Sequence, residues 1–172
     1  MLHVFIITME DQKNEPALLS EAPQKLSELL PSVLHDADLE YTTKIDELVV
    51  KAPGELIQTI CKTLKTNNGL FFDYLRCLSV VDYQDFLEIN YHLFSYMKRH
   101  KMVLKCELNP TQPSISSVSN IWKAANWFER EAHDLFGVVF DDHPSLERLL
   151  LPDDFEGNPG LKSYPLHEYK EW

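Results

Sequence analysis

The sequence predicts an α+β fold: a two-layer domain with helices packed on a mixed or antiparallel sheet, followed by an extended irregular tail. Apolar residues recur at helical spacing in three separate segments. They alternate with polar residues in 87–93 and 102–108, which is the period of half-buried strands. The last segment carries four prolines, which exclude a long helix there. We therefore expect an α+β domain at 1–140 and a tail at 141–172.

The first part of the chain contains one predicted helix and two predicted strands. Residues 1–8 fit a strand or a poorly anchored start, and the apolar positions of 16–34 indicate an amphipathic helix. Its two prolines, Pro23 and Pro31, mark boundaries or kinks, because proline removes a backbone donor. Loose alternation over 39–51 indicates two strands joined by a turn.

The middle of the chain adds a second helix and a hairpin. Pro53 opens the helix and the Asn-Asn-Gly run at 67–69 ends it. Its expected apolar face consists of Leu56, Ile57, Ile60 and Leu64. Segment 70–81 is apolar and fits a strand or a helix equally well. The basic run 98–101 lies between the two alternating segments, where we expect a hairpin tip, and the Pro- and Ser-rich segment 109–119 is expected to be a loop.

Residues 120–140 are predicted to form one helix followed by a short strand. Asn120 is expected to cap the helix with its side-chain oxygen, and Gly137 to end it in the left-handed conformation. One stripe of the helix, predicted to face the core, contains Ile121, Ala125, Phe128, Ala132 and Leu135. The opposite side is crowded with the charged or polar residues Glu129, Arg130, Glu131, His133 and Asp134.

The tail at 141–172 is irregular but rich in large apolar side chains. These are Leu146, Leu149, Leu150, Leu151, Phe155, Leu161, Tyr164, Leu166 and Trp172. Disordered tails are usually depleted in such residues. The segment therefore either wraps its own domain or lies along another protein. We favour a partner, because long irregular segments of this kind tend to be functional.

Composition bounds the class of protein. At 172 residues the chain can bury one core, and its formal net charge of −11 argues against nucleic-acid binding, which needs Lys and Arg at the phosphates. This acidity suits a cytoplasmic protein or one that docks on basic protein surfaces. The start of the chain lacks the basic region and cleavage site of a signal peptide. No apolar run approaches the ~20 residues of a membrane span.

Motifs for catalysis or cofactor binding are missing from the sequence. Cys61, Cys77 and Cys106 are widely spaced, so we expect neither zinc nor an iron–sulfur cluster in this chain itself. The sequence contains no P-loop, GxGxxG, HExxH or GxSxG motif. We therefore expect no catalytic, cofactor-binding or metal-binding residue.

One cluster of acidic and histidine residues has two interpretations. As ligands of a divalent metal, the candidates are Glu129, His133, Asp141, Asp142 and His143. Alternatively, Glu129–His133 and Arg130–Asp134 are ordinary pairs four residues apart on a helix surface, and 141–144 is a turn. We favour the second interpretation, because clusters without a motif are usually solvated or paired.

The run from Ile121 to Gly137, IWKAANWFEREAHDLFG, resembles the signature of the 30-kilodalton subunit of respiratory complex I. Bacterial NADH:quinone oxidoreductase calls this its C subunit, and plastid-type complexes call it their J subunit. The resemblance continues through the tail and reaches back weakly to about Leu70. The family's tail often reads G-H-P-L-R-K-D-F-P-L, whereas at 157–166 this chain keeps only Lys162 of the Arg-Lys-Asp. The signature and expected interface residues are Trp122, Asn126, Trp127, Glu129, Arg130, Glu131, Asp134, Phe136, Gly137, His143, Pro144, Arg148, Leu149, Phe155, Gly157, Pro159, Lys162, Tyr164, Pro165 and Leu166.

The resemblance implies a structural subunit without a cofactor of its own. FMN, iron–sulfur clusters and quinone would be bound by other subunits of a proton-translocating NAD(P)H or ferredoxin:quinone oxidoreductase. The implied partners are the 49-kilodalton-type subunit, near the quinone site, and neighbouring cluster-bearing subunits. The chain would meet the membrane only through the complex, on its cytoplasmic side, or on the stromal or matrix side in an organelle.

Two alternatives remain from the sequence. One is the homologous subunit of an energy-converting membrane-bound hydrogenase. The other, from a different class, is a stand-alone metal-dependent hydrolase that uses Glu129, His133, Asp141 and His143. If the resemblance to complex I holds, the tail would dock on the 49-kilodalton-type subunit. Its expected anchors are Leu149, Phe155, Tyr164 and Leu166, with Arg148 and Lys162 as polar points.

Overall fold

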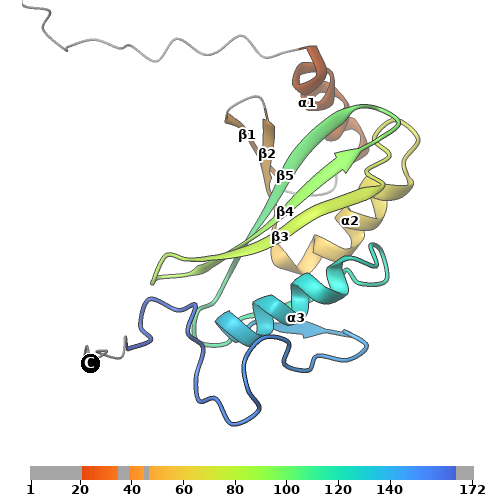
Figure 1. Cartoon of the computed structure of the whole chain (residues 1–172). Coiled ribbons are helices and arrows are strands. Elements are labelled where there is room, and N and C mark those ends of the chain that lie inside the picture. The colour runs from red at the N-terminus through yellow and green to blue at the C-terminus, as the bar shows by residue number, and fades with distance from the viewer. Residues whose placement is uncertain (1–20, 35–38, 45–46, 166–172) are drawn as a thin grey trace, which may run out of the picture.

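A computed structural model describes residues 21–34, 39–44 and 47–165. Its centre is a five-stranded sheet with the strand order β1-β2-β5-β4-β3 (Figure 1). The strands are β1 (Glu40–Lys44), β2 (Glu47–Lys51), β3 (Tyr74–Asp82), β4 (Leu87–Ser95) and β5 (His100–Leu108). Strand β2 pairs with β5 in parallel and all other neighbours pair antiparallel, so the sheet is mixed. The predicted fold class is confirmed.

One face of this sheet forms the core. The register aligns Leu75, Leu93, Met102 and Leu48 in a row across four strands, and each is at most 1% exposed. Side chains alternate between the two faces of a strand, so a regular alternation of apolar residues produces such rows. The predicted strand pair at 87–93 and 102–108 is confirmed as β4 and β5. The undecided segment 70–81 becomes the edge strand β3 from Tyr74 onward.

Two helices complete this core. Helix α1 (Glu21–Val33) buries Leu26 and Leu30 and contains Pro31 in its last turn. Helix α2 (Ile57–Thr66) follows a short 3₁₀ turn, η1 (Gly54–Leu56). The buried residues of α2 are Ile57, Ile60, Cys61 and Leu64. Leu56 was expected on this face, but it is 36% exposed because it belongs to the 3₁₀ turn before the helix.

The end of α2 follows the prediction. The Asn67 side-chain oxygen accepts the backbone N–H groups of Gly69 and Leu70, at 2.8 and 3.3 Å. This side chain therefore replaces the helical acceptor and turns the chain toward β3.

Helix α3 (Ala125–Phe136) starts later than predicted. Asn120 is not its cap: the N-cap position is Ala124 and no side chain caps it. Residues before it form turns instead, in which Ile121 and Trp122 donate their N–H groups to the carbonyl of Val118 at 2.9 Å. Gly137 ends the helix at φ 74°, as predicted, with its N–H bonded to the His133 carbonyl at 2.9 Å.

The predicted core stripe of α3 is only partly correct. Ala125 and Ala132 are buried, but Phe128 is half-buried against the core and Leu135 is also half-buried. The reason is the position of α3, which packs along the edge strand β3 and not over the middle of the sheet (Figure 1). Ile121 precedes the helix and packs against the core from the turn.

A small second sheet joins the expected loop to the expected strand. Strand β7 (Val139–Asp141) fits the predicted strand at 138–140 and pairs in parallel with β6 (Ser114–Ser116). The loop 109–119 therefore contains a strand that the sequence did not predict. The register places Ile115 opposite Phe140, and both are buried, at 3% and 2% exposure.

The described part of the tail, 142–165, contains neither helix nor strand. It lies against its own domain at several points: Leu146 and Leu161 pack on the core, and the Gly160 N–H bonds the Leu135 carbonyl at 2.8 Å. The expected segment 1–8 and the expected anchor Leu166 lie outside the described residues.

Candidate functional site

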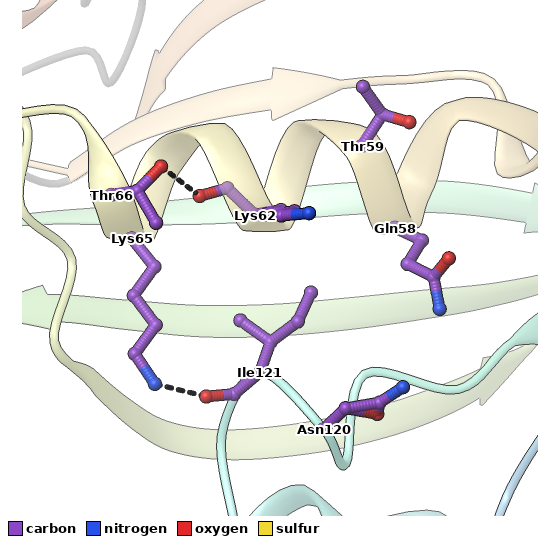
Figure 2. A pocket seen from close by; sticks show the side chains of 7 residues that line it. All are labelled: Gln58, Thr59, Lys62, Lys65, Thr66, Asn120 and Ile121. Atoms are coloured by element: carbon purple, nitrogen blue, oxygen red, sulfur yellow. Dashed lines mark hydrogen bonds between the residues drawn. The ribbon is translucent and has the colours of Figure 1, made fainter.

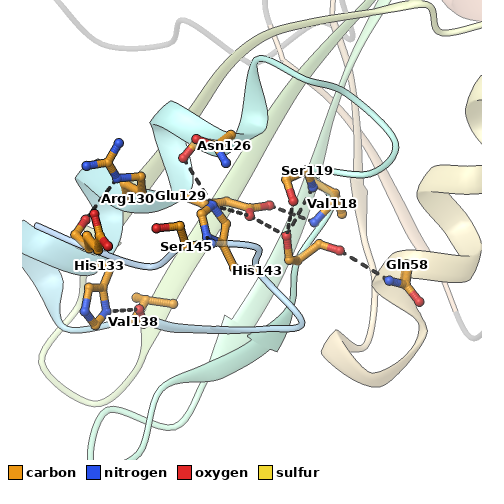
Figure 3. A network of polar contacts seen from close by, with 12 residues as sticks. Gln58, Val118, Ser119, Asn126, Glu129, Arg130, His133, Val138, His143 and Ser145 are labelled. Carbon is orange, nitrogen blue, oxygen red and sulfur yellow. Dashed lines mark hydrogen bonds and ion pairs between the residues drawn. The ribbon is translucent and has the colours of Figure 1, made fainter. Parts of the chain in front are cut away.

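Helix α3 carries Glu129 into the interior of the protein, although the sequence placed this residue on a charged surface. The side chain is 0% exposed. Its carboxylate accepts the Ser117 hydroxyl at 2.6 Å and the Val118 N–H at 2.7 Å, and the Ser117 hydroxyl also contacts that of Ser119 at 2.8 Å (Figure 3). Glu129 thereby fixes the loop before α3 to the helix.

Burial governs the protonation of Glu129. Loss of hydration penalises the charged form and raises its pKa to about 7, although the hydrogen bonds from Ser117 and Val118 act in the opposite direction. A carboxyl group with this pKa is close to half protonated at neutral pH. Such a value marks a candidate for acid–base chemistry, but structural networks produce it too.

The nearest ionisable neighbour of Glu129 is His143, from the tail. Its Nε2 lies 3.8 Å from the Glu129 carboxylate and 3.3 Å from the Asn126 carbonyl, and both ionisable side chains are fully enclosed. Its Nδ1 accepts the Ser145 N–H at 3.1 Å, so the proton is on Nε2 and the ring is neutral. Burial lowers the pKa of His143, which agrees with this assignment.

His133 does not face Glu129. Its Nδ1 lies 2.8 Å from the carbonyl of Val138, just beyond the helix. The predicted surface pair Glu129–His133 is therefore wrong, because Glu129 turns inward while His133 closes the C-terminus of α3.

Asp134 is the second buried acid of α3, at 3% exposure. One carboxylate oxygen accepts three successive N–H groups of the tail, those of Leu149, Leu150 and Leu151, at 3.1, 2.8 and 2.9 Å. Burial by itself would raise the pKa of Asp134, but these N–H groups and the charge of Arg148 lower it overall. Asp134 thus stays ionised and holds the tail in place.

Arg130 also binds the tail and not a carboxylate. Its guanidinium donates to the carbonyls of Glu147 and Arg148, at 3.0 and 2.9 Å. It also lies 5.3 Å from the centre of the Trp127 ring. The predicted pair Arg130–Asp134 is therefore wrong: each partner binds a different set of tail backbone groups.

Arg148 and Asn158 continue this pattern of side chains that bind backbone. Arg148 donates to the carbonyls of Pro152 and Phe155 at 3.0 and 2.7 Å. Asn158 donates to the Asp134 carbonyl at 3.1 Å. Its amide also fills the space beside Gly137, where a Cβ atom would lie 2.9 Å from the Asn158 oxygen. Gly137 is thus required both by its positive φ and by this close approach.

The far end of the tail meets the end of β3. The Lys162 N–H donates to the Asp82 carboxylate at 2.7 Å, and this bond, together with one from the Gln84 N–H, lowers the pKa of Asp82. Phe155 and Tyr164 stack with ring centres 6.0 Å apart. Gly157, at φ 87°, allows this turn, because a Cβ atom there would lie 2.9 Å from the Tyr164 ring.

The remaining signature residues divide between the interior and the surface. Trp122 is 3% exposed and donates its indole N–H to the Phe72 carbonyl at 3.0 Å, so it belongs to the core. Trp127, in contrast, is 60% exposed. Phe136, Leu149, Phe155, Pro159 and Tyr164 are half-buried, whereas Glu131, Pro144, Lys162 and Pro165 are exposed.

The four residues of the metal-hydrolase hypothesis do not converge. Glu129 and His143 are neighbours, but His133 bonds a backbone carbonyl and Asp141 accepts the Ser114 hydroxyl at 2.7 Å on the surface. Across the described ranges, no group of three or more His, Cys, Asp or Glu residues could hold a metal ion. The hypothesis therefore lacks a site in this part of the chain.

A separate groove of about 510 Å³ lies between α2 and the turn at 120–121 (Figure 2). The Lys65 ammonium donates to the Ile121 carbonyl across it. Its remaining lining residues are Gln58, Thr59, Lys62, Thr66 and Asn120. No acid or nucleophilic thiol lines this groove, so it offers no second acid–base centre.

The sequence did not predict the partners of the buried acids. Ser117 and Val118 lie in what looked like a plain linker, and the N–H groups of 149–151 have no residue-type signature. The one signal present was the density of charge on α3, which pointed to the right helix but to the wrong environment.

The chain matches the family described as respiratory-chain NADH dehydrogenase, 30 Kd subunit, over residues 50–170. It is 37% identical to the NADH-quinone oxidoreductase C subunit of Roseiflexus castenholzii over 140 residues, which cover 80% of each chain. It is 38% identical to the C 2 subunit of the same enzyme in Rhizobium meliloti, over 69% of this chain and 66% of that one.

Solved structures share the fold. A chain of the membrane-bound sulfane sulfur reductase, an archaeal respiratory membrane complex, superposes with a TM-score of 0.71 at 24% identity, covering 83% of this chain and 86% of that one. A trypsin-resistant fragment of Nqo5 gives a TM-score of 0.56 at 22% identity, covering 71% and 99%. None of the described helices is long and apolar enough to cross a membrane. From the family match and the relatives that share it, the chain belongs to the family of the 30 Kd subunit of the respiratory-chain NADH dehydrogenase.

Proposed function

We propose that this chain is a structural subunit in the hydrophilic arm of a proton-translocating NAD(P)H or ferredoxin:quinone oxidoreductase. It supports the 49-kilodalton-type subunit near the quinone site and binds no cofactor itself. FMN, iron–sulfur clusters and quinone belong to other subunits of this complex. The chain lies on the cytoplasmic side of the membrane, or on the stromal or matrix side in an organelle.

The observation that carries this proposal is the use of the charged residues of α3. Glu129, Arg130 and Asp134 all bind groups of this same chain, and most of those groups are backbone. Catalytic groups need access to a substrate, whereas these side chains are spent on fixing the loop at 117–119 and the tail. Their role is therefore positioning.

What these bonds position is a surface with exposed apolar side chains. Trp127 and Leu150 are 60% and 58% exposed, and Arg130 lies beside both, over the Trp127 ring and at the Arg148 carbonyl. Exposed Trp beside Arg is typical of the residues that dominate binding energy at protein interfaces. The half-buried anchors Leu149, Phe155 and Tyr164 continue this surface along the tail.

The test replaces an outward-facing side chain while keeping the internal bonds. Leu150→Ser retains the backbone N–H that binds Asp134 but removes an exposed apolar group, so the isolated protein should keep its melting temperature. In cells that carry this variant, we expect less assembled complex on native gels of the membranes. Leu29→Ser is the matched control, because Leu29 is 41% exposed on α1.

The outcomes separate scaffolding from catalysis. Normal assembly with a loss of quinone reductase turnover per complex would support a catalytic role instead. Normal assembly with normal turnover would show that this surface is not the interface.

A related complex is the second candidate. The fold is shared with a chain of an archaeal respiratory membrane complex, so the homologous subunit of an energy-converting membrane-bound hydrogenase has the same architecture available. The large subunit that copurifies with this chain decides between them: paired CxxC nickel ligands in that subunit favour the hydrogenase.

A further inference from the structure

Three aromatic rings gather at the end of the sheet where β3 begins and β4 meets β5. The register aligns Tyr74, Phe94 and Lys101 across these strands, so they share one face. Tyr96, in the turn after β4, has its ring 5.4 Å from that of Tyr74 and 5.1 Å from that of Phe94. Tyr74 and Tyr96 are 42% and 55% exposed.

These rings border a hollow of about 320 Å³. Its lining residues are Tyr74, Arg76, Phe94, Tyr96 and Lys101, which we call the aromatic–basic patch. A hollow of this size accepts a large side chain, and Tyr, Phe and Arg are residue types enriched in protein interfaces.

The patch is held in shape by the segment before β3. The Tyr96 N–H donates to the Asp73 carboxylate at 3.0 Å. His100 lies 2.6 Å from the Leu70 carbonyl, and its ring packs on Phe72 with centres 4.7 Å apart. Because the turn is fixed before any partner arrives, binding would cost little ordering of the chain.

The patch is also a positive island on an acidic protein of net charge −11. Arg76 and Lys101 share a single carboxylate, that of Glu47, at 3.0 and 3.4 Å. Two further cations adjoin it: Lys98 is exposed, and the Arg99 guanidinium lies 5.9 Å from the Phe94 ring centre. Four cations thus face the two carboxylates of Glu47 and Asp73, which leaves an excess of positive charge at this end of the sheet.

We propose that the aromatic–basic patch binds an acidic protein segment, which inserts one apolar side chain between Tyr74 and Tyr96 and places its carboxylates on Lys101 and Arg76. The concave shape favours a side chain over a flat lipid surface. Four cations on a chain this acidic are too few for a nucleic-acid backbone.

This site goes beyond the proposed function, because it lies at the other end of β3. The tail reaches Asp82, the last residue of β3, whereas Tyr74 is the first. The two ends are about 26 Å apart by the rise of an extended strand. The two surfaces therefore contact different polypeptides or different segments of one polypeptide.

Photo-cross-linking of the full chain in its native membranes tests the site directly. A benzophenone amino acid is introduced at Tyr96, and the cross-linked peptide is identified by mass spectrometry. We expect one product whose partner peptide is rich in Asp and Glu. A lipid adduct, a peptide without acidic excess, or no product overturns the proposal. The same label at Tyr83, beside the tail, reports the proposed dock separately, so each can fail without the other.

Binding to a defined probe supplies the second test. The probe is a fluorescent 12-residue peptide of Glu and Asp with one central Phe, titrated with the purified full chain. We expect Tyr96→Ala and Lys101→Gln each to weaken binding roughly fivefold or more. Lys62→Gln, which removes the same charge from α2, is the control and should leave affinity unchanged.

Melting temperatures of all three variants exclude unfolding as the cause of a loss. Equal weakening by Lys62→Gln would show that only net charge matters and would overturn the site. Co-sedimentation with phosphatidylserine vesicles that depends on Lys101, without peptide binding, would assign the patch to lipid instead.

Discussion

At the scale of single residues, the protein places its most informative charges where water does not reach them. Glu129 and His143 form an enclosed carboxyl–imidazole contact at 3.8 Å, and Asp134 collects three N–H groups on one oxygen. The two acids behave oppositely because their partners differ. Desolvation dominates at Glu129, whereas backbone donors dominate at Asp134.

Glu129 makes the stability of the protein depend on pH in a defined window. Its pKa rises from an ordinary 4.5 to about 7 on folding. Because the unfolded chain loses this proton first, the stabilisation is complete below pH 4.5 and is lost as the pH rises toward 7. Glu129→Gln removes this titration and can still accept from Val118.

The measurement is urea denaturation of both proteins between pH 4.5 and pH 7.5. We expect the wild type to lose stability relative to Glu129→Gln by about 3 kcal/mol across the window. His143 titrates with Glu129 as a pair, so the curve reports both groups. A difference that stays constant with pH would mean that Glu129 titrates at its ordinary value.

At the scale of elements, α3 acts as a clamp between the edge of the sheet and the tail. One side of the helix rests on β3 through Phe128 and Ala132, while Arg130 and Asp134 bind the backbone of the tail. The loop before the helix is held by Glu129. Changes on the two sides of α3 should therefore have different consequences, one for stability and one for assembly.

On the sheet side, Phe128→Ala should cost less than a fully buried Phe. The side chain is half-buried against the core, so we expect a loss of about 1.5–3 kcal/mol in the free energy of unfolding. Chemical denaturation measures it. The adjacent Trp127→Ala, at a position 60% exposed, is the comparison and should cost less than about 1 kcal/mol. If both variants lose equally, the orientation of the helix is wrong.

On the tail side, Arg130→Lys should lower assembly with little effect on folding. Lysine keeps the charge but cannot span the carbonyls of Glu147 and Arg148, so about 1 kcal/mol of tail anchoring is lost. Native gels of membranes quantify the complex, and Arg76→Lys is the control because Arg76 is exposed and bonds a single carboxylate. Wild-type assembly with reduced turnover would point to catalysis.

At the scale of the whole molecule, the tail and the domain are joined more closely than the sequence suggests. Leu146 and Leu161 pack on the core, and the tail supplies all the donors to one oxygen of a buried carboxylate. The two proposed binding surfaces lie at opposite ends of β3. The chain thus has the layout of a spacer with contacts at two ends.

Truncation after Phe140 tests whether 1–140 is a domain by itself. Removal of the tail leaves Asp134 without its three donors, and an unpaired buried charge costs several kcal/mol. We expect the truncated protein to unfold at markedly lower urea concentration than the full chain. Asp134→Asn in the truncated chain should recover part of the loss, since the neutral amide costs less to bury. A truncated chain with full stability would make the tail a pure docking segment.

Local sequence was sufficient where neighbours in the chain decide the structure. The alternation of 87–93 and 102–108 predicted β4 and β5, and Asn67 and Gly137 marked helix ends, because periodicity and turn chemistry act within a few residues. The family signature, a continuous run, was also visible in the sequence.

Tertiary structure decided what depends on distant partners. The burial of Glu129 and Asp134 follows from N–H groups at 118 and 149–151, and every residue except proline carries such a group, so no residue type announces it. The late start of α3 has the same origin, because turns that bond to Val118 replace the cap expected from Asn120. Segment 70–81 became a strand only because β4 offers it an antiparallel partner, and a short apolar run does not contain that information.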